Sequence, residues 1–212
     1  EFLMMFVILA AIYTVIRQFG ADAQAGFGVG NRINQALFLP VMAVAFATAP
    51  VAGQNFGAGL HDRVRETFRF AALFGSGLMV VMTLLCHWQP AAMVRVFTDD
   101  AEVVGVGVEF LQMISWNYVA SGLIFTCSGM FQALGNTVPA LLSSASRLLT
   151  FVLPLLLISR LPGFELQHVW WLSVGTTTLQ ALFSLWLLHR EFRLKLRPAG
   201  AQPDVMLNTV TK

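Results

Sequence analysis

The sequence predicts an all-α integral membrane protein with six transmembrane helices, and its composition is the first reason. Hydrophobic residues make up 57% of the 212-residue chain and charged residues only 11%, and the mean hydropathy is +0.70. A soluble domain carries roughly 25% charged residues, because its surface must face water. The second reason is a series of apolar runs that approach the ~20 residues needed for a helix to cross a bilayer. Together these observations favour a membrane bundle over a soluble helical protein.

The six spans are predicted, in chain order, at residues 2–16, 25–55, 67–88, 103–134, 138–158 and 169–188. The first is short for a membrane helix, which indicates that its start is clipped. The second is longer than the ~30 Å hydrocarbon core at about 1.5 Å per residue, so it is expected to tilt, bend or project. Residues 1–196 are therefore expected to form one domain, and residues 197–212 a polar, disordered tail.

Residues at the ends of the later spans fit these boundaries. Trp88 closes the third span, at a depth where aromatic rings are enriched. Asp100 and Glu102 open the fourth, where acidic groups complement the helix dipole. Pro139 lies in the first turn of the fifth, a position that proline tolerates.

A turn of small residues separates the second and third spans and is the main landmark along the chain. It reads Gly-Gln-Asn-Phe-Gly-Ala-Gly over residues 53–59 and leads into a charged loop. Two prolines lie inside the second span, where they either mark a helix that faces a protein-lined interior or form inert kinks. The positions expected to serve bending and close packing are Pro40, Pro50, Gly53, Gln54, Gly57 and Gly59.

Basic residues predict the orientation in the membrane. Six spans place both chain ends on one side, and that side carries more basic residues than the other. The terminal side holds Arg63, Arg65, Arg69, Arg190, Arg193, Lys195 and Arg197, whereas the opposite side holds Arg17, Arg95 and Arg160. By the positive-inside rule, both ends are expected in the cytoplasm.

Polar side chains inside the spans are the candidate functional residues, because charges and amides at membrane depth are costly. Those expected to line a polar cavity are Asn31, Asn34, Gln35, Glu109, Gln112, Trp116 and Asn117. The first three share one face of the second span, at i, i+3 and i+4. Glu109, Gln112 and Trp116 form a stripe on the fourth at i, i+3 and i+7, and the indole could stack on a cationic or planar ligand.

The alternative role for these residues is hydrogen bonding between helices. In that case Glu109 forms an ion pair with Arg32 or with Arg147. Arg147 lies beside Ser143 and Ser144 in the fifth span. Both arginines are expected to be structural.

Other functional classes have little support. Basic runs interleaved with aromatic residues are absent from the sequence, which argues against nucleic-acid binding. Cys86 and Cys127 lie in apolar runs and fit small buried hydrophobes. The histidines flank spans without ligand spacing, and neither H-E-x-x-H nor G-x-S-x-G occurs, so no metal site and no enzyme are expected.

Five segments, taken in order, resemble the multidrug and toxic compound extrusion (MATE) transporters. They are FGADAQAGFGVGNRI (19–33), PVAGQNFGAGLHDRVRE (50–66), VFTDDAEVV (96–104), GMFQALGNTVPAL (129–141) and RLLTFVLP (147–154). Each falls at the expected place between spans, and the likeness covers residues 1–196. The resemblance implies one six-helix lobe of a twelve-helix, two-lobe transporter. The chain resembles the second lobe only. The Gly-Ala-Gly turn occurs in related form once per lobe in that family and once here, which agrees with a single lobe.

The function that this resemblance implies is export of organic cations and other drugs by ion-coupled antiport with alternating access, in a bacterial cytoplasmic (inner) membrane. The implied partners are a small cationic amphiphile, the lipid bilayer and the N-terminal lobe of the same protein. No cofactor or metal is expected. The coupling ion, H⁺ or Na⁺, is expected to bind mainly in the first lobe, because the acids that sodium-coupled members carry in the first and fourth helices of this lobe have no clear counterpart here.

Two alternatives remain at this stage. One is an exporter or flippase of the same architecture that carries lipid-linked compounds or metabolites, and the other is an inactive fragment without its N-terminal lobe. The coding sequence upstream of Glu1 is expected to encode six further spans with a second Gly-Ala-Gly turn. A start codon within a few residues of Glu1 would contradict the expectation of a two-lobe protein.

Overall fold

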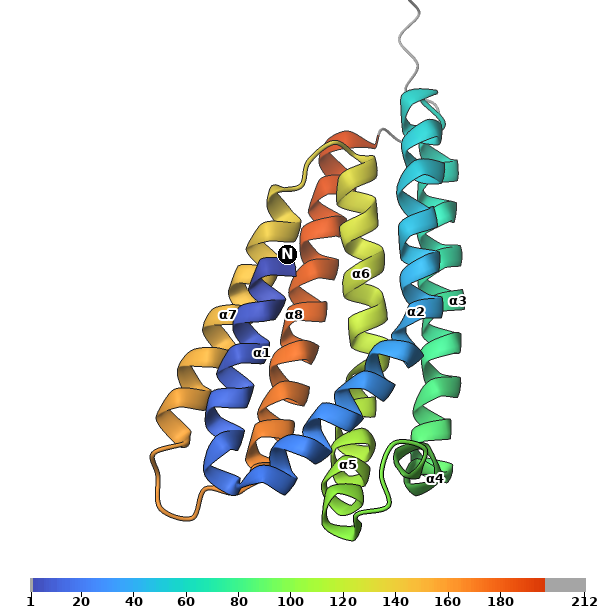
Figure 1. Ribbon diagram of the computed structural model, residues 1–212. Helices are drawn as coiled ribbons and strands as arrows, with labels where there is room; N and C mark the ends of the chain where they lie inside the picture. Colours follow the sequence, from blue (N-terminus) through green and yellow to red (C-terminus); the bar gives the residue numbers. More distant parts are fainter. Residues whose placement is uncertain (1, 197–212) are drawn as a thin grey trace, which may run out of the picture.

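Helices account for nearly all of residues 2–196, the part of the chain that the computed structural model describes (Figure 1). The helices are α1 (Phe2–Ile16), α2 (Ala21–Gly57), α3 (His61–Trp88), α4 (Pro90–Arg95), α5 (Ala101–Ile114), α6 (Tyr118–Ala133), α7 (Val138–Ile158) and α8 (Leu166–Lys195). Two 3₁₀ turns, η1 (Arg17–Phe19) and η2 (Ser115–Asn117), complete the order. The predicted all-α class is confirmed. Glu1 and the predicted polar tail at 197–212 lie outside the described residues.

Helices α2, α3, α7 and α8 are long and apolar enough to cross a membrane, and α1 is apolar but shorter. Helices α1 and α7 begin and end where the first and fifth spans are predicted. Helices α2, α3 and α8 extend beyond the predicted spans, because their polar end residues continue the helix outside the hydrocarbon region. The predicted span at 103–134 corresponds to helical residues from Ala101 to Ala133, divided into α5 and α6 by the 3₁₀ turn η2.

Local signals explain where several helices begin and end. The Oδ1 atom of Asp100 accepts hydrogen bonds from the backbone N–H groups of Glu102 and Val103, at 2.9 and 3.3 Å. This is the capping role expected of an acid at the start of a helix. Gly59 adopts a φ of 72° just after α2, a conformation that favours glycine at a helix end. The Leu60 N–H group then donates to the carbonyl of Asn55 at 2.9 Å and closes the end of α2.

Glycines let the helices around α2 approach closely. A Cβ atom at Gly26 would lie 2.6 Å from the Cβ of Val106 on α5, and Gly30 lies directly against the ring of Phe110. On α6, a Cβ at Gly129 would lie 2.7 Å from the carbonyl oxygen of Ala45 on α2. Such small-residue contacts take the place of hydrophobic attraction between helices in lipid.

Helix α2 bends about halfway along its length (Figure 1). Pro40 lies near the middle of this 37-residue helix, and proline both removes a backbone hydrogen bond and pushes on the preceding turn. Near the end of α2, a Cβ at Gly53 would lie 3.8 Å from the Cα of Ala133 on α6, an ordinary van der Waals contact, whereas a Cβ at Gly57 would meet no atom within 4 Å. The predicted close packing is therefore wrong for Gly57, because the last turn of α2 projects beyond α6, and a side chain would also fit at Gly53. Gln54 is exposed in the same turn.

One end of the bundle gathers the α2–α3 turn, the α6–α7 turn and the end of α8 (Figure 1). Arg65 at the start of α3 donates to the carbonyl of Leu196 at 3.3 Å, and Lys195 donates to the carbonyl of Leu134 at 2.8 Å. The basic residues at the start of α3 and at the end of α8 that were predicted to share one side of the membrane therefore lie together at this end, whereas Arg197 lies outside the described residues.

The α2–α6 crossing gives a stability test. We expect Gly129→Ala to lower stability by about 1–3 kcal/mol, because the added methyl group meets a backbone carbonyl that cannot swing away. The measurement is the apparent Tm of the full-length protein in detergent. Gly77→Ala on α3 is the matched control, since a Cβ there meets nothing within 4 Å. The control should be neutral or stabilising because alanine favours helix, and equal Tm values for both variants would contradict the close crossing.

Candidate functional site

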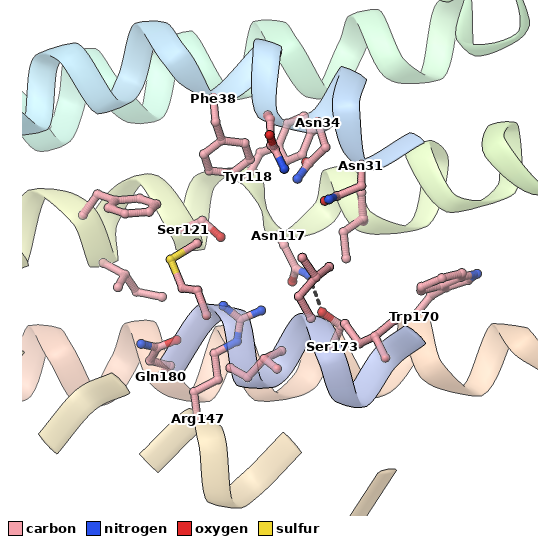
Figure 2. Close-up of a pocket in the computed structure, with 18 of the residues that line it drawn as sticks. Asn31, Asn34, Phe38, Asn117, Tyr118, Ser121, Arg147, Trp170, Ser173 and Gln180 are labelled. Atoms are coloured by element: carbon pink, nitrogen blue, oxygen red, sulfur yellow. Dashed lines mark hydrogen bonds between the residues drawn. The ribbon is translucent and has the colours of Figure 1, made fainter. Parts of the chain in front are cut away.

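A cavity of about 500 Å³ lies within the bundle and is lined by residues of α1, α2, α5, α6, α7 and α8 (Figure 2). Most of the lining is apolar, with a few polar side chains. Part of the wall is an aromatic cluster in which Trp170 stacks on Phe27 with ring centroids 5.6 Å apart. The same indole meets Phe110 edge-on at 4.9 Å. An apolar pocket with few polar groups is the usual form of a small-molecule site.

The α2 wall of the cavity carries the predicted amide face. Asn31, Asn34 and Gln35 all line the cavity, together with Phe38 one turn further on. These residues immediately precede Pro40, so the amides lie next to the bend in α2. The Oδ1 atom of Asn34 is buried and has no hydrogen-bond partner among the described residues. This wall therefore offers the cavity an acceptor that a ligand could use.

The break between α5 and α6 forms a second wall. Asn117, the last residue of η2, lines the cavity with Tyr118 and Ser121. The Nδ2 group of Asn117 donates to the Oγ atom of Ser173 on α8 at 3.3 Å (Figure 2). A 3₁₀ stretch in the middle of a helix often marks a functional hinge or local strain. The Asn117–Ser173 bond thus fixes the broken span to the opposite wall.

Helices α7 and α8 provide the third wall, which the sequence analysis did not predict. Ser144, Arg147, Ser173 and Gln180 line the cavity from these two helices. The Nε2 group of Gln180 donates to the Oγ of Ser143 at 3.3 Å, and that oxygen also lies 2.5 Å from the Oγ of Ser184. A sequence signal for this wall exists, because polar residues recur along one face of α8. They are Ser173, Thr177, Gln180 and Ser184, at i, i+4, i+7 and i+11.

Three of the predicted cavity residues lie elsewhere. Glu109, Gln112 and Trp116 are not among the residues that line the cavity. The face of α5 and α6 that does line it runs through Phe110, Ile114, Asn117 and Ser121, one helical position away from the predicted stripe. Of the residues predicted on the fourth span, Asn117 lies on the lining face. Ser121 and Ser128, at i+4 and i+11 from Asn117, are the sequence signal for the rest of that face.

Trp116 points away from the cavity. Its side chain is 61% exposed and meets the ring of His87 edge-on at 5.3 Å. The predicted stacking of Trp116 on a ligand in this cavity is therefore wrong. The indole that borders the cavity is that of Trp170, which is 1% exposed.

The predicted ion pair of Glu109 with Arg32 or Arg147 is also wrong. The ion pairs within residues 2–196 are Arg65–Asp62 at 3.4 Å and Lys195–Glu191 at 3.5 Å. Arg32 is exposed on α2 and lies outside the cavity lining. Arg147 reaches the cavity, and its buried Nε atom has no hydrogen-bond partner within the described part of the chain.

The donor groups in this region do not form a metal centre. Within residues 2–196, no cluster of three or more His, Cys, Asp or Glu side chains has the arrangement needed to hold a metal ion. Cys86 and Cys127 are both buried free thiols. The cavity is therefore described by its amides, hydroxyls, aromatic rings and a single guanidinium group.

Comparison with known proteins places this architecture in a family. The model of the family named MatE matches residues 1–158. The chain belongs to the MatE family. It is 30% identical over 133 residues to the probable multidrug resistance protein YpnP of Bacillus subtilis, an alignment that covers 63% of this chain and 30% of that relative. It is 25% identical over 150 residues to a FAD transporter of Shewanella oneidensis, covering 69% of this chain and 32% of the relative.

The fold of this MatE chain also matches a solved transporter structure. An outward-facing multidrug resistance MATE family transporter superposes with a TM-score of 0.85 at 18% identity, covering 92% of this chain and 44% of the other. The chain therefore spans less than half the length of the relatives and structures named here. Family, fold and apolar helices together show an integral membrane protein related to transporters.

The Asn117–Ser173 bond gives the test for this site. We expect a double-mutant cycle with Asn117→Ala and Ser173→Ala to show a coupling of about 0.5–2 kcal/mol, because either single change leaves a buried partner unsatisfied. The cycle is measured by unfolding of the full-length protein. Thr178→Ala is the control, since Thr178 bonds to the carbonyl of Val174 on its own helix at 2.9 Å. Additive effects of the two cavity changes would show that the bond does not hold η2 to α8.

Proposed function

We propose that this chain is the second lobe of a two-lobe exporter, and that its cavity is this lobe's part of the substrate path. The observation that carries the proposal is the cavity itself, which lies beside a proline bend in α2 and a helix break between α5 and α6. Bent and broken helices at mid-membrane depth are the usual setting of transporter binding sites. The limited coverage of the relatives supports a partner lobe in the complete protein.

The mechanism in this proposal is alternating access, in which the two lobes rock about the central site. Pro40 lies next to the amide face of α2, so a change in the bend would move Asn31 and Asn34 relative to α7 and α8. At the crossing of α2 with α6, glycine permits close approach of the two helices. The bend therefore lies between the crossing of α2 with α6 and the half of α2 that carries the amide face of the cavity.

We propose a bacterial cytoplasmic membrane location with both ends of this chain in the cytoplasm. The shared end of the bundle that holds Arg63, Arg65 and Arg193 supports this orientation. Coupling to H⁺ or Na⁺ belongs to the same proposal. The described lining residues include no Asp or Glu, which supports a coupling acid outside this cavity, on the partner lobe.

The substrate in the family resemblance is an organic cation or drug. Such a cation would need an anionic partner from the other lobe, because the charged group among the described lining residues is a guanidinium. A metabolite or lipid-linked exporter of the same architecture is the second candidate. It is favoured by the positive charge of the guanidinium in the cavity lining and by the likeness to a FAD transporter.

Cysteine accessibility tests alternating access without assuming a substrate. Ser144→Cys is placed in full-length protein with Cys86→Ser and Cys127→Ser, and labelled with a membrane-impermeant maleimide from each side of a vesicle. We expect the ratio of labelling rates from the two sides to change about tenfold when the H⁺ or Na⁺ gradient is reversed, a population shift of about 1.4 kcal/mol.

Ala58→Cys serves as the matched control, because Ala58 is exposed in the turn after α2. It should react from one side under every gradient. If Ser144→Cys behaves in the same one-sided way, the cavity does not alternate and the proposal fails.

A further inference from the structure

Arg147 is the charged group among the described residues that line the cavity. It rises from α7, and Figure 2 shows its guanidinium group inside the cavity, between the walls that carry Asn117 and Gln180. The other charged side chains of residues 2–196 lie outside the lining. The described lining of this cavity therefore carries a positive charge.

The local structure does not neutralise this charge. Neither ion pair within residues 2–196 includes Arg147, and its buried Nε atom has no acceptor. The hydroxyl groups of Ser146 and Thr150 on α7 donate to backbone carbonyls of their own helix. Ser146 donates to the carbonyl of Ser143 at 2.7 Å, and Thr150 donates to the carbonyl of Ser146 at 2.8 Å.

An unpaired guanidinium at membrane depth calls for a partner, because burying a charge without one is costly. A guanidinium presents several N–H donors in one plane, which matches the oxygen atoms of a carboxylate, phosphate or sulfonate in a bidentate contact. A bound cation would instead be repelled, and repulsion between like charges is strong where water is excluded. The cavity therefore discriminates by charge in favour of anions.

The rest of the lining describes the body of that ligand. Phe27, Phe110 and Trp170 offer aromatic faces. The side-chain oxygens of Asn117 and Gln180 are buried and lack partners within the described residues, so they can accept from hydroxyl or N–H groups of a ligand. The arrangement thus has an anion-binding group, an aromatic wall and spare acceptors around one space of about 500 Å³.

We infer that the substrate of this lobe is an amphiphilic organic anion whose acidic group binds Arg147. The inference rests on the proposed transport function, and it names the substrate class of the same cavity. The anionic group contacts the guanidinium of α7, and the apolar or aromatic body packs between α2 and α8.

Two dyes of opposite charge test the inference. Carboxyfluorescein is an organic anion and rhodamine 123 an organic cation, and both contain a xanthene ring system. Transport of each dye is measured with full-length protein in proteoliposomes. We expect the wild type to prefer carboxyfluorescein, and Arg147→Gln to lower its transport rate at least about tenfold, equivalent to about 1.4 kcal/mol. Arg147→Lys should retain part of the rate, because it keeps the charge and loses the bidentate geometry.

Arg32→Gln is the matched control, since Arg32 is an exposed arginine of α2 outside the cavity. It should leave the dye preference unchanged. Arg147→Glu should reverse the preference toward rhodamine 123, a result that a merely structural arginine does not predict.

Three results would overturn the inference: a wild-type preference for rhodamine 123, an equal loss of both dyes in Arg147→Gln, or transport of neither dye by the wild type. The cysteine-accessibility measurement separates these failures from failure of the transport proposal. If labelling of Ser144→Cys responds to the gradient, the lobe is a moving part of a transporter and only the anionic substrate is rejected. If labelling does not respond, the transport proposal itself fails.

Discussion

The weak attraction between apolar helices in lipid is the constraint on which this bundle depends. Lipid tails are as apolar as leucine, so helices associate through close packing and hydrogen bonds instead. Helices α2 and α6 use the first means, with Gly129 set against the carbonyl of Ala45. Helices α7 and α8 use the second, through the hydroxyl groups of Ser143 and Ser184. The α2–α6 pair and the α7–α8 pair are each held by their own contacts, so a cavity can remain between them.

The cavity lies where these two pairs face each other. Aromatic packing around Trp170 closes part of its wall, and the Asn117–Ser173 bond ties the pairs together across the broken span. The bend at Pro40 and the break at η2 both border this space. Irregular backbone at membrane depth is stable only where protein or water can satisfy it. The same cavity that offers room for a ligand therefore also accommodates the two irregularities of the bundle.

Sequence periodicity predicted the parts of the site that lie on uninterrupted helix. The face of Asn31, Asn34 and Gln35 lines the cavity because the 3.6-residue repeat holds along that stretch of α2. The stripe of Glu109, Gln112 and Trp116 predicted on the fourth span does not line the cavity. The lining face lies one position further along and includes the apolar Phe110, which polarity alone does not mark. Arg147 lines the same cavity as residues of α2 and α6, a non-local arrangement that no pattern within one helix can reveal. The likeness of five ordered segments gave the fold class and the family, but not the charge of the cavity.

The unpaired guanidinium also restricts how the cavity can close. A guanidinium sealed in a dry cavity without an anion loses its hydration, at a cost of several kcal/mol in a protein interior. With the cavity open, water can satisfy Arg147, so the empty lobe favours a state that faces an aqueous side. An anionic ligand replaces that water with charge-assisted hydrogen bonds and so permits occlusion. Ligand binding and closure of the cavity would then be coupled through Arg147. A bound anion pairs with the guanidinium in the closed state, whereas an empty closed cavity leaves it unpaired. In the proposed transport cycle, the empty lobe would return when another group approaches Arg147, and a carboxylate of the proposed partner lobe would have the chemistry to do so when its proton or sodium ion departs.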